Sequence, residues 1–313
     1  MIWYVKNGNV AFGGKRTEEV LISLLGDSVQ RDKLLQFLEL PFQLAASNFV
    51  TQCLTNPEVV PLRSGDPQIN QISSFLWNPN KKKLKLLDIG AGKGRLLSGL
   101  AELDEDIVNH LDYFAFDTSN ENKQDCEYQI ISIYSTNGKW FNSDESLFTA
   151  TDKNTFDVAV LCNVLHEIPP DSWPEFFGSS GLLQRSLSPQ GHLLIVEDMR
   201  IPVGELPNHR GYFFLDTAHL KTLFCVTVID IETNKFIVND VRDGRLKAHL
   251  ISTELLVRVT SNSRKQAITE LQATAKRKIK EAREAVPATF DDGQKYGFWS
   301  QQLANCVLYL DQA

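Results

Sequence analysis

The chain has 313 residues, which is enough for one domain with sizeable additions or for two units. A hydrophobic content of 42% excludes general disorder, and a net charge of −7 argues against a protein whose whole surface binds nucleic acid. The five cysteines form no CxxC pair, so their spacing favours neither a disulfide framework nor a structural zinc site. With no signal-like start and no run of about 20 apolar residues, we expect a cytoplasmic protein that does not enter a membrane.

Residues 1–80 are predicted to form a helical N-terminal region. The segments "TEEVLISLLG" and "RDKLLQFLEL" have helical character, and apolar residues of "PFQLAASNFVTQCL" recur at helical spacing. The following "TNPEVVPLRSGDPQ" is rich in proline and turn-forming residues, so we interpret it as a connection.

From about residue 84 to 200, short apolar runs alternate with amphipathic stretches. Strands that are apolar on both faces and separated by helices are typical of a parallel sheet covered on both sides. The predicted strands are 84–89, 112–116, 156–162 and 192–197, and the predicted helices are 95–103 and 173–187.

The last hundred residues change character twice. A helix over 215–224 is followed by three predicted strands, 226–231, 235–241 and 246–251. Asp243-Gly244 between the last two strands indicates a hairpin, because this pair tolerates positive φ angles. Beyond residue 260, apolar residues at spacings of three and four predict helices again. We therefore divide the chain into a helical N-terminal region (1–80), a central α/β domain (81–260) and a helical C-terminal region (261–313).

The most informative stretch is "LLDIGAGKGRLL", residues 86–97. A strand ends in Asp88, then Gly90, Gly92 and Gly94 follow at every second position, and a helix begins. Glycines allow a sharp turn and a close approach to a ligand. The sixth position of a dinucleotide fingerprint is Arg95 instead of glycine, and the phosphate-loop pattern is also missing. The alternative interpretation of this stretch is an ordinary tight turn without a ligand.

This D-x-G-x-G-x-G pattern resembles the first motif of the class I S-adenosylmethionine (SAM)-dependent methyltransferases. The resemblance implies a Rossmann-like sheet, mostly parallel with an antiparallel hairpin edge, and SAM as cofactor. It implies that Asp117, at the end of the next strand, accepts the ribose hydroxyls. Asp144, after "FNS", would face the adenine amine, although "SDES" is equally suited to a solvated loop. Asn163 would lie near the methionine part of the cofactor.

The stretch 161–202 resembles the central part of small-molecule O-methyltransferases. Carried over by position, His166 of "NVLHEIPP" would take the proton of an acceptor hydroxyl, and Glu197 would orient this histidine. Glu167-Ile168 departs from the Asp-Trp of that motif. Many class I enzymes that methylate carbon or nitrogen also carry Val-Leu-His at this bend, where the histidine is structural, so both roles stay open.

Other functions remain as alternatives. Seven Lys and Arg residues within 264–284 give a basic helix face that could dock RNA or a protein substrate, although such a face is more often solvated. A non-catalytic SAM-binding sensor or scaffold is the third hypothesis. The histidines are scattered and the acids form no convincing ligand set, so we expect no metal. The leading prediction is a methyltransferase that acts on a small-molecule hydroxyl.

Overall fold

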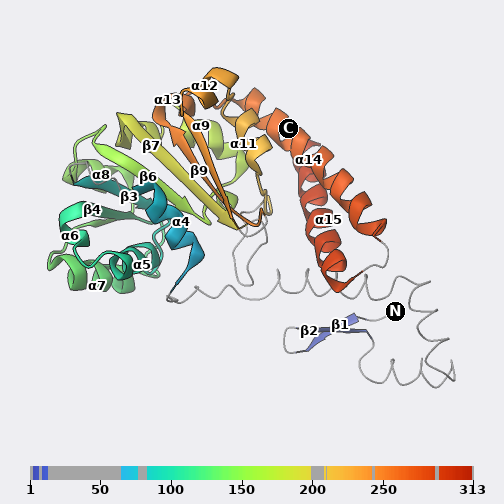
Figure 1. The fold of residues 1–313 in the computed structure, drawn as a ribbon, viewed down its shortest axis with the longest axis horizontal. Helices are drawn as coiled ribbons and strands as arrows, with labels where there is room; N and C mark the ends of the chain where they lie inside the picture. Colours follow the sequence, from blue (N-terminus) through green and yellow to red (C-terminus); the bar gives the residue numbers. More distant parts are fainter. Residues whose placement is uncertain are drawn as a thin grey trace. The chain divides into compact units, whose positions relative to one another are not determined.

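The structure is a computed structural model that describes residues 3–6, 9–12, 65–76, 83–198, 208, 210–241, 244–285 and 289–311. The chain forms two compact units (Figure 1). One contains Val59–Met199 and Pro207–Ala267, and the other contains Met1–Glu58, Arg200–Leu206 and Ile268–Ala313. The helices predicted between residues 17 and 54 lie outside the described residues. The predicted domain limits near residues 80 and 260 stay a prediction.

The larger unit is built around a seven-stranded sheet with the order β5-β4-β3-β6-β7-β9-β8. All neighbouring pairs from β5 to β7 are parallel, and β9 is antiparallel to both β7 and β8. The mostly parallel sheet with an antiparallel hairpin edge is thereby confirmed. The strands are β3 (Leu84–Ile89), β4 (Leu111–Phe116), β5 (Trp140–Phe141), β6 (Phe156–Cys162), β7 (Leu187–Asp198), β8 (Phe236–Val241) and β9 (Leu246–Ser252).

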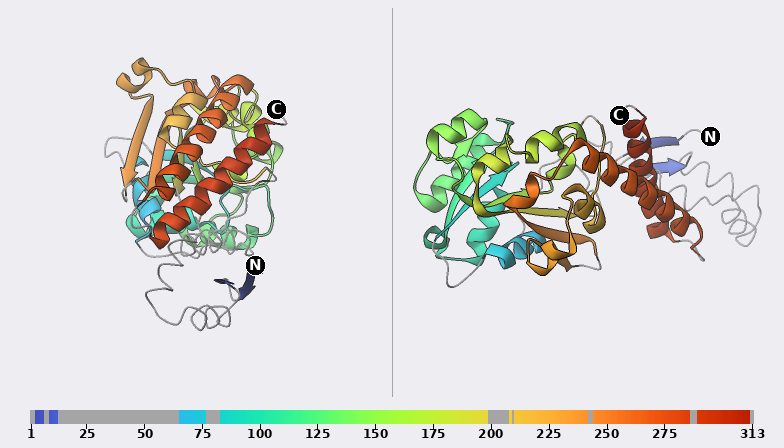
Figure 2. Two further views of the ribbon diagram at one scale, coloured as in Figure 1. Left: turned by 90° about the vertical axis from the view of Figure 1, so that its right-hand side faces the viewer. Right: turned by 90° about the horizontal axis from the view of Figure 1, so that it is seen from above.

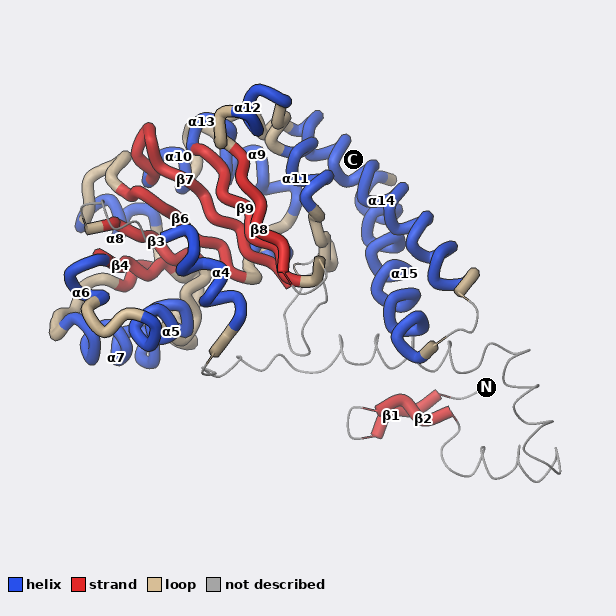
Figure 3. Tube along the Cα trace, viewed as in Figure 1, coloured by secondary structure: helices blue, strands red, loops and turns tan. Residues whose placement is uncertain are grey.

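Helices cover both faces of this sheet (Figures 2 and 3). The helices α4, α5 and α7 lie on one face, and α8, α9 and α10 lie on the other. The helix predicted over 173–187 is interrupted at Gly178, which ends α9. The helices of this unit are α4 (Pro67–Leu76), α5 (Arg95–Leu103), α6 (Ile107–His110), α7 (Lys123–Tyr134), α8 (Asp144–Ala150), α9 (Trp173–Phe177), α10 (Leu182–Ser186), α11 (Thr217–Leu223), α12 (Val228–Glu232) and α13 (Thr253–Leu256).

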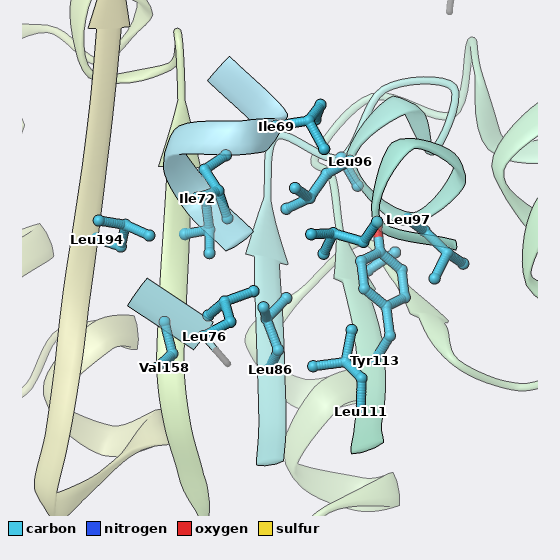
Figure 4. Packing of buried hydrophobic residues seen from close by; sticks show 14 of the residues in the cluster. Ile69, Ile72, Leu76, Leu86, Leu96, Leu97, Leu111, Tyr113, Val158 and Leu194 are labelled. Carbon is cyan, nitrogen blue, oxygen red and sulfur yellow. The ribbon is translucent and has the colours of Figure 1, made fainter. Parts of the chain in front are cut away.

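The core under α4 shows how an unpredicted helix is held on the sheet. Apolar residues of α4 recur at spacings of three and four, so they share one face. In Figure 4, Ile72 and Leu76 point toward Leu86, Val158 and Leu194 of three strands, and all five side chains are buried. Each such buried side chain contributes about 2 kcal/mol through removal of apolar area from water. The apolar face therefore fixes α4 across the middle of the sheet.

One predicted strand is wrong. Residues 226–231 contribute to α12 because Thr227 and Asp230 form a capping box at its start. The helix α14 (Ser261–Arg283) begins in the larger unit and continues into the second one from Ile268, where α15 (Phe290–Leu310) runs beside it, as Figures 1 and 2 show. Strands β1 (Trp3–Lys6) and β2 (Asn9–Phe12) form an antiparallel hairpin that the sequence analysis did not foresee.

Candidate active site

The loops that carry the predicted site residues meet at the carboxyl edge of the sheet. The last residue of β3, Ile89, lies beside Phe116 of β4 on one side and Leu161 of β6 on the other. The chain leaves β3 toward β4 and later returns to β6, so the order of strands reverses at β3. Such a reversal leaves a crevice outside the carboxyl ends of the strands, where α/β proteins bind ligands.

The glycine loop between β3 and α5 depends on left-handed backbone conformations. The φ angles are +71° at Gly90, +50° at Gly92 and +80° at Gly94. A Cβ atom at Gly90 would lie 2.6 Å from Cγ2 of Val164, whereas a Cβ at Gly92 would meet no atom within 4 Å. Gly90 therefore lets the loop pack against the segment after β6, and Gly92 leaves open space beside the loop.

Asp117 follows β4 and holds this loop directly. Its Oδ2 accepts the Gly92 backbone N–H at 2.9 Å, and its Oδ1 accepts the Ser119 N–H at the same distance. A carboxylate oxygen has a second lone pair, so both oxygens can still accept a further hydrogen bond from a ligand. The side chain is partly exposed, which keeps it accessible.

Asp88, at the end of β3, lies inside the core. Its side chain is 3% exposed and accepts a hydrogen bond from the Tyr113 hydroxyl at 2.6 Å. Burial raises the pKa of Asp88 from 3.8 to about 7, although the Tyr113 hydrogen bond opposes this rise; the negative charge of Asp117 adds to it. The structure thus gives Asp88 a buried position and Asp117 a partly exposed one.

Asn163 follows β6 in a left-handed conformation, with φ of +57° and 8% exposure. Its side chain makes a reciprocal amide pair with Gln68 of α4. Gln68 Nε2 donates to Asn163 Oδ1 at 2.9 Å, and Asn163 Nδ2 donates to Gln68 Oε1 at 3.1 Å. The same Oδ1 also accepts the backbone N–H of Asp198, the last residue of β7, at 3.1 Å.

Gln68 was missed by the sequence analysis, which treated this segment as a connection. The available signal was a pair of glutamines, Gln68 and Gln71, three residues apart beside the apolar stripe of α4. Both are buried, at 5% and 4% exposure.

Asp144 is the first residue of α8, and Ser143 caps this helix by accepting the Ser146 N–H. The Asp144 carboxylate pairs with Arg185, at 2.8 Å between Oδ2 and Nη1. The guanidinium of Arg185 lies 4.3 Å from the centre of the Phe148 ring. Asp144 is thus held at the surface by a salt bridge rather than left solvated.

His166 lies in a short 3₁₀ helix, η1 (Leu165–Glu167), that follows β6. Its Nδ1 is 3.0 Å from Glu197 Oε2, and the other oxygen of Glu197 accepts the Leu165 N–H at 3.0 Å. Both side chains are buried, with 1% exposure for His166. Glu197 therefore fixes both the ring of His166 and the backbone that carries it.

Aromatic residues surround this histidine. The Phe214 ring stacks on it at 5.2 Å between ring centres, and the Tyr212 ring lies at 5.4 Å. Asn208 donates from Nδ2 to the His166 carbonyl at 2.8 Å. Asn208, Tyr212 and Phe214 thus pack around His166, whereas Trp173 and Phe177 are buried in the α9 region.

Three of the seven basic residues in 264–284 pair with neighbouring glutamates. Glu281 pairs with Arg277 and Lys278, and Lys280 pairs with Glu284 at 3.7 Å. Within the part of the chain that the structure describes, no group of three or more His, Cys, Asp or Glu side chains is arranged to hold a metal ion. No helix in the described ranges combines the length and apolar character that a membrane span requires.

Residues 64–223, just over half of the chain, match a family model described as a methyltransferase domain. The chain belongs to this family. It is a SAM-dependent methyltransferase of class I, and the resemblance noted from the glycine motif is confirmed. A search of curated proteins finds no match.

Several solved methyltransferases are similar to this chain at low sequence identity and low TM-scores. A SAM-dependent methyltransferase from Aquifex aeolicus is 14% identical, over 58% of this chain and 87% of that chain, with a TM-score of 0.37. The DszA carbon methyltransferase is 15% identical, over 79% of this chain and 74% of its own, with a TM-score of 0.40. The mitomycin 7-O-methyltransferase MmcR is 13% identical, over 59% and 52%, with a TM-score of 0.36. These likenesses concern the fold alone.

The residues at the carboxyl edge fit the cofactor. The open space beside Gly92 admits a ligand close to the backbone, and Asp117 next to it retains lone pairs for two hydroxyl groups. Among the described residues, no side chain caps the first turn of α5, which begins at Arg95 directly after the loop.

Proposed function

We propose that this methyltransferase transfers its methyl group to a hydroxyl group of a small molecule, and that His166 takes the hydroxyl proton. The observation that carries the proposal is the 3.0 Å contact between His166 Nδ1 and Glu197. A carboxylate in this position favours the ring tautomer with its proton on Nδ1, so Nε2 carries the lone pair of the neutral ring.

The proposed reaction is an in-line displacement that depends on alignment. Bound SAM supplies a methyl group on a positively charged sulfur. With SAM bound, the acceptor oxygen would displace the sulfur at the methyl carbon and leave S-adenosylhomocysteine, and Nε2 of His166 would accept the hydroxyl proton. Glu197 then stabilises the imidazolium that results. The rings of Tyr212 and Phe214 support an acceptor with an apolar body, because they give the surroundings of His166 an aromatic character.

For the cofactor, we assign the loop of Gly90, Gly92 and Gly94 to the close backbone approach and Asp117 to the ribose hydroxyls. Asp88 would act from beneath the loop, and Asn163 would lie near the methionine part. Asp144 would contribute at the adenine end, where its pair with Arg185 would hold it in place. We further propose a cytoplasmic location, which the free thiols of Cys126, Cys162, Cys225 and Cys306 support.

The alternative of an RNA or protein substrate on α14 has less support. Three of its basic residues already pair with Glu281 on the same helix or with Glu284 directly after it, which lowers their net field.

The test uses His166→Asn and Glu197→Gln, with His192→Asn, in the middle of β7, as a control. Each protein is incubated with SAM and a panel of phenols, enols and aliphatic alcohols, and release of S-adenosylhomocysteine (SAH) is measured by mass spectrometry. We expect His166→Asn to bind SAM normally but to lose turnover by about 10²- to 10⁴-fold, as removal of a general base requires. Glu197→Gln should lose less turnover than His166→Asn.

The pH profile gives a second readout. Wild-type turnover should fall at acidic pH as His166 becomes protonated, and this dependence should be absent in His166→Asn. Unchanged turnover in folded His166→Asn would refute the base role, and lost SAM binding would indicate a structural role. SAM binding by the wild type without turnover on any acceptor would favour the sensor hypothesis.

A further inference from the structure

Polar side chains of α4 contact two parts of the sheet, the hairpin of β8 and β9 and the end of β6. The apolar residues of α4 hold it on the sheet, and Gln68 and Gln71 extend from the same side. Gln71 Nε2 donates to the carbonyls of Asn239 at 3.0 Å and Leu246 at 3.2 Å, so it binds the hairpin of β8 and β9. Gln68 instead reaches the end of β6. The two glutamines thus have similar burial but different partners.

The contact of Gln68 with Asn163 determines how the Asn163 carboxamide is oriented. An isolated amide can turn by 180° at little cost, which exchanges its donor and acceptor. Here Gln68 accepts from Asn163 Nδ2 and donates to Asn163 Oδ1, and the Asp198 N–H also donates to this oxygen. Only one orientation satisfies all three bonds, and because the group is 8% exposed, water offers little replacement.

A second contact ties the start of α4 to the end of the glycine loop. Arg95, the first residue of α5, donates from Nε to Asp66 Oδ2 at 2.9 Å and from Nη2 to Gln68 Oε1 at 3.3 Å. Asp66 in turn accepts the Gln68 backbone N–H at 2.9 Å. Gln68 therefore contacts both the segment that follows the glycine loop and the segment that follows β6.

On this basis we infer that Gln68 is a positioning residue of the methyl-transfer site, which acts through Asn163 to hold the end of β6 against the glycine loop for cofactor binding. The inference rests on the proposed assignment of Asn163 and the loop to the cofactor. It extends the site to a helix that precedes the first strand of the sheet. Gln71, one turn away, serves the hairpin and has no part in this arrangement.

The experiment compares Gln68→Leu with the matched control Gln71→Leu, using the full chain. Leucine is close to glutamine in size, so both variants keep the packing of α4. Because leucine has no amide, both variants lose buried hydrogen bonds from this helix. Titration calorimetry measures the Kd for SAM and for SAH, and thermal unfolding checks the fold. We expect Gln68→Leu to raise both Kd values by about 10-fold, the order expected when a buried group loses its partner. The control should stay within about 2-fold, with a similar loss of thermal stability.

The variant Asn163→Gly removes the carboxamide but tolerates the positive φ angle. If Gln68 acts through Asn163, the double variant Gln68→Leu/Asn163→Gly should bind SAM no more weakly than Asn163→Gly alone. Additive losses would contradict this route of action. Equal losses in Gln68→Leu and Gln71→Leu, or a wild-type Kd in folded Gln68→Leu, would overturn the inference. A wild-type Kd for SAM in folded Gly92→Val would instead refute the assigned cofactor site. His166→Asn should lower turnover and leave the Kd for SAM unchanged.

Discussion

At the scale of single residues, the site places acids in contrasting environments. Asp117 is partly exposed and accepts two backbone N–H groups, whereas Asp88 is buried with Tyr113 as its hydrogen-bond partner. A buried carboxyl group ionises with difficulty because the charged form loses its hydration. Asp88 therefore weakens the fold at the pH where it must ionise.

We predict that Asp88→Asn stabilises the cofactor-free protein, and more so at pH 8 than at pH 5. Burial raises the pKa of Asp88 from 3.8 to about 7, so the folded state retains a proton that the unfolded state has lost. The stability tied to this proton is complete below pH 4 and is lost as the pH rises through 7. The difference between the two pKa values corresponds to about 4 kcal/mol, which is an upper bound for the increase in the free energy of unfolding of Asp88→Asn at pH 8.

Urea unfolding of both proteins at the two pH values measures this effect. The stabilisation by Asp88→Asn should be larger at pH 8 than at pH 5 by about 3 kcal/mol, since pH 5 lies within the titration range. A pH-independent gain would show that Asp88 is ionised at both values, and a loss at pH 8 would show that the charge stabilises the fold.

At the scale of elements, α12 shows how a local cap decides between strand and helix. Residues 226–231 contain five β-branched residues and an alternating pattern. The Thr227 hydroxyl accepts the Asp230 N–H at 3.3 Å, and the Asp230 carboxylate accepts the Thr227 N–H at 2.8 Å. Val228 and Ile229 are 69% and 66% exposed, so neither is buried as a strand of this sheet would require.

We predict that Thr227→Val destabilises the protein by about 1 kcal/mol, the usual cost of a lost N-cap. Valine has the shape of threonine but no oxygen to accept the Asp230 N–H. Thr233→Val, at the other end of α12, is the matched control and should stay within about 0.5 kcal/mol because this residue is exposed. Urea unfolding measures both, and equal effects would argue against a special role of the cap.

At the scale of the whole molecule, the chain divides into two compact units, and the proposed site residues all belong to the larger one. Compact units with separate cores commonly unfold in separate steps. A ligand that binds only the folded state of one unit stabilises that unit by mass action.

We predict that SAM raises only one of two thermal transitions. At about 100 times its Kd, a ligand adds about 2.7 kcal/mol, which corresponds to about 5 to 10 °C for a unit of this size. Differential scanning calorimetry with and without SAM measures the shift, and Gly92→Val provides a control in which no shift is expected. A single transition that moves as a whole would show that the two units unfold together.

The sequence by itself determined the class of this protein. The alternation of apolar strands with helices predicted the parallel sheet, because a strand buried on both faces is apolar along its own length. The stretch "LLDIGAGKGRLL" with Asp117 indicated the methyltransferase family, because the need of the loop for glycine is also visible in neighbouring residues. The placement of Gln68 against Asn163 and of Asp88 in the core was decided only by tertiary structure. Gln68 and Asn163 are 95 positions apart, and a contact between such distant residues arises only when the sheet brings its carboxyl ends together.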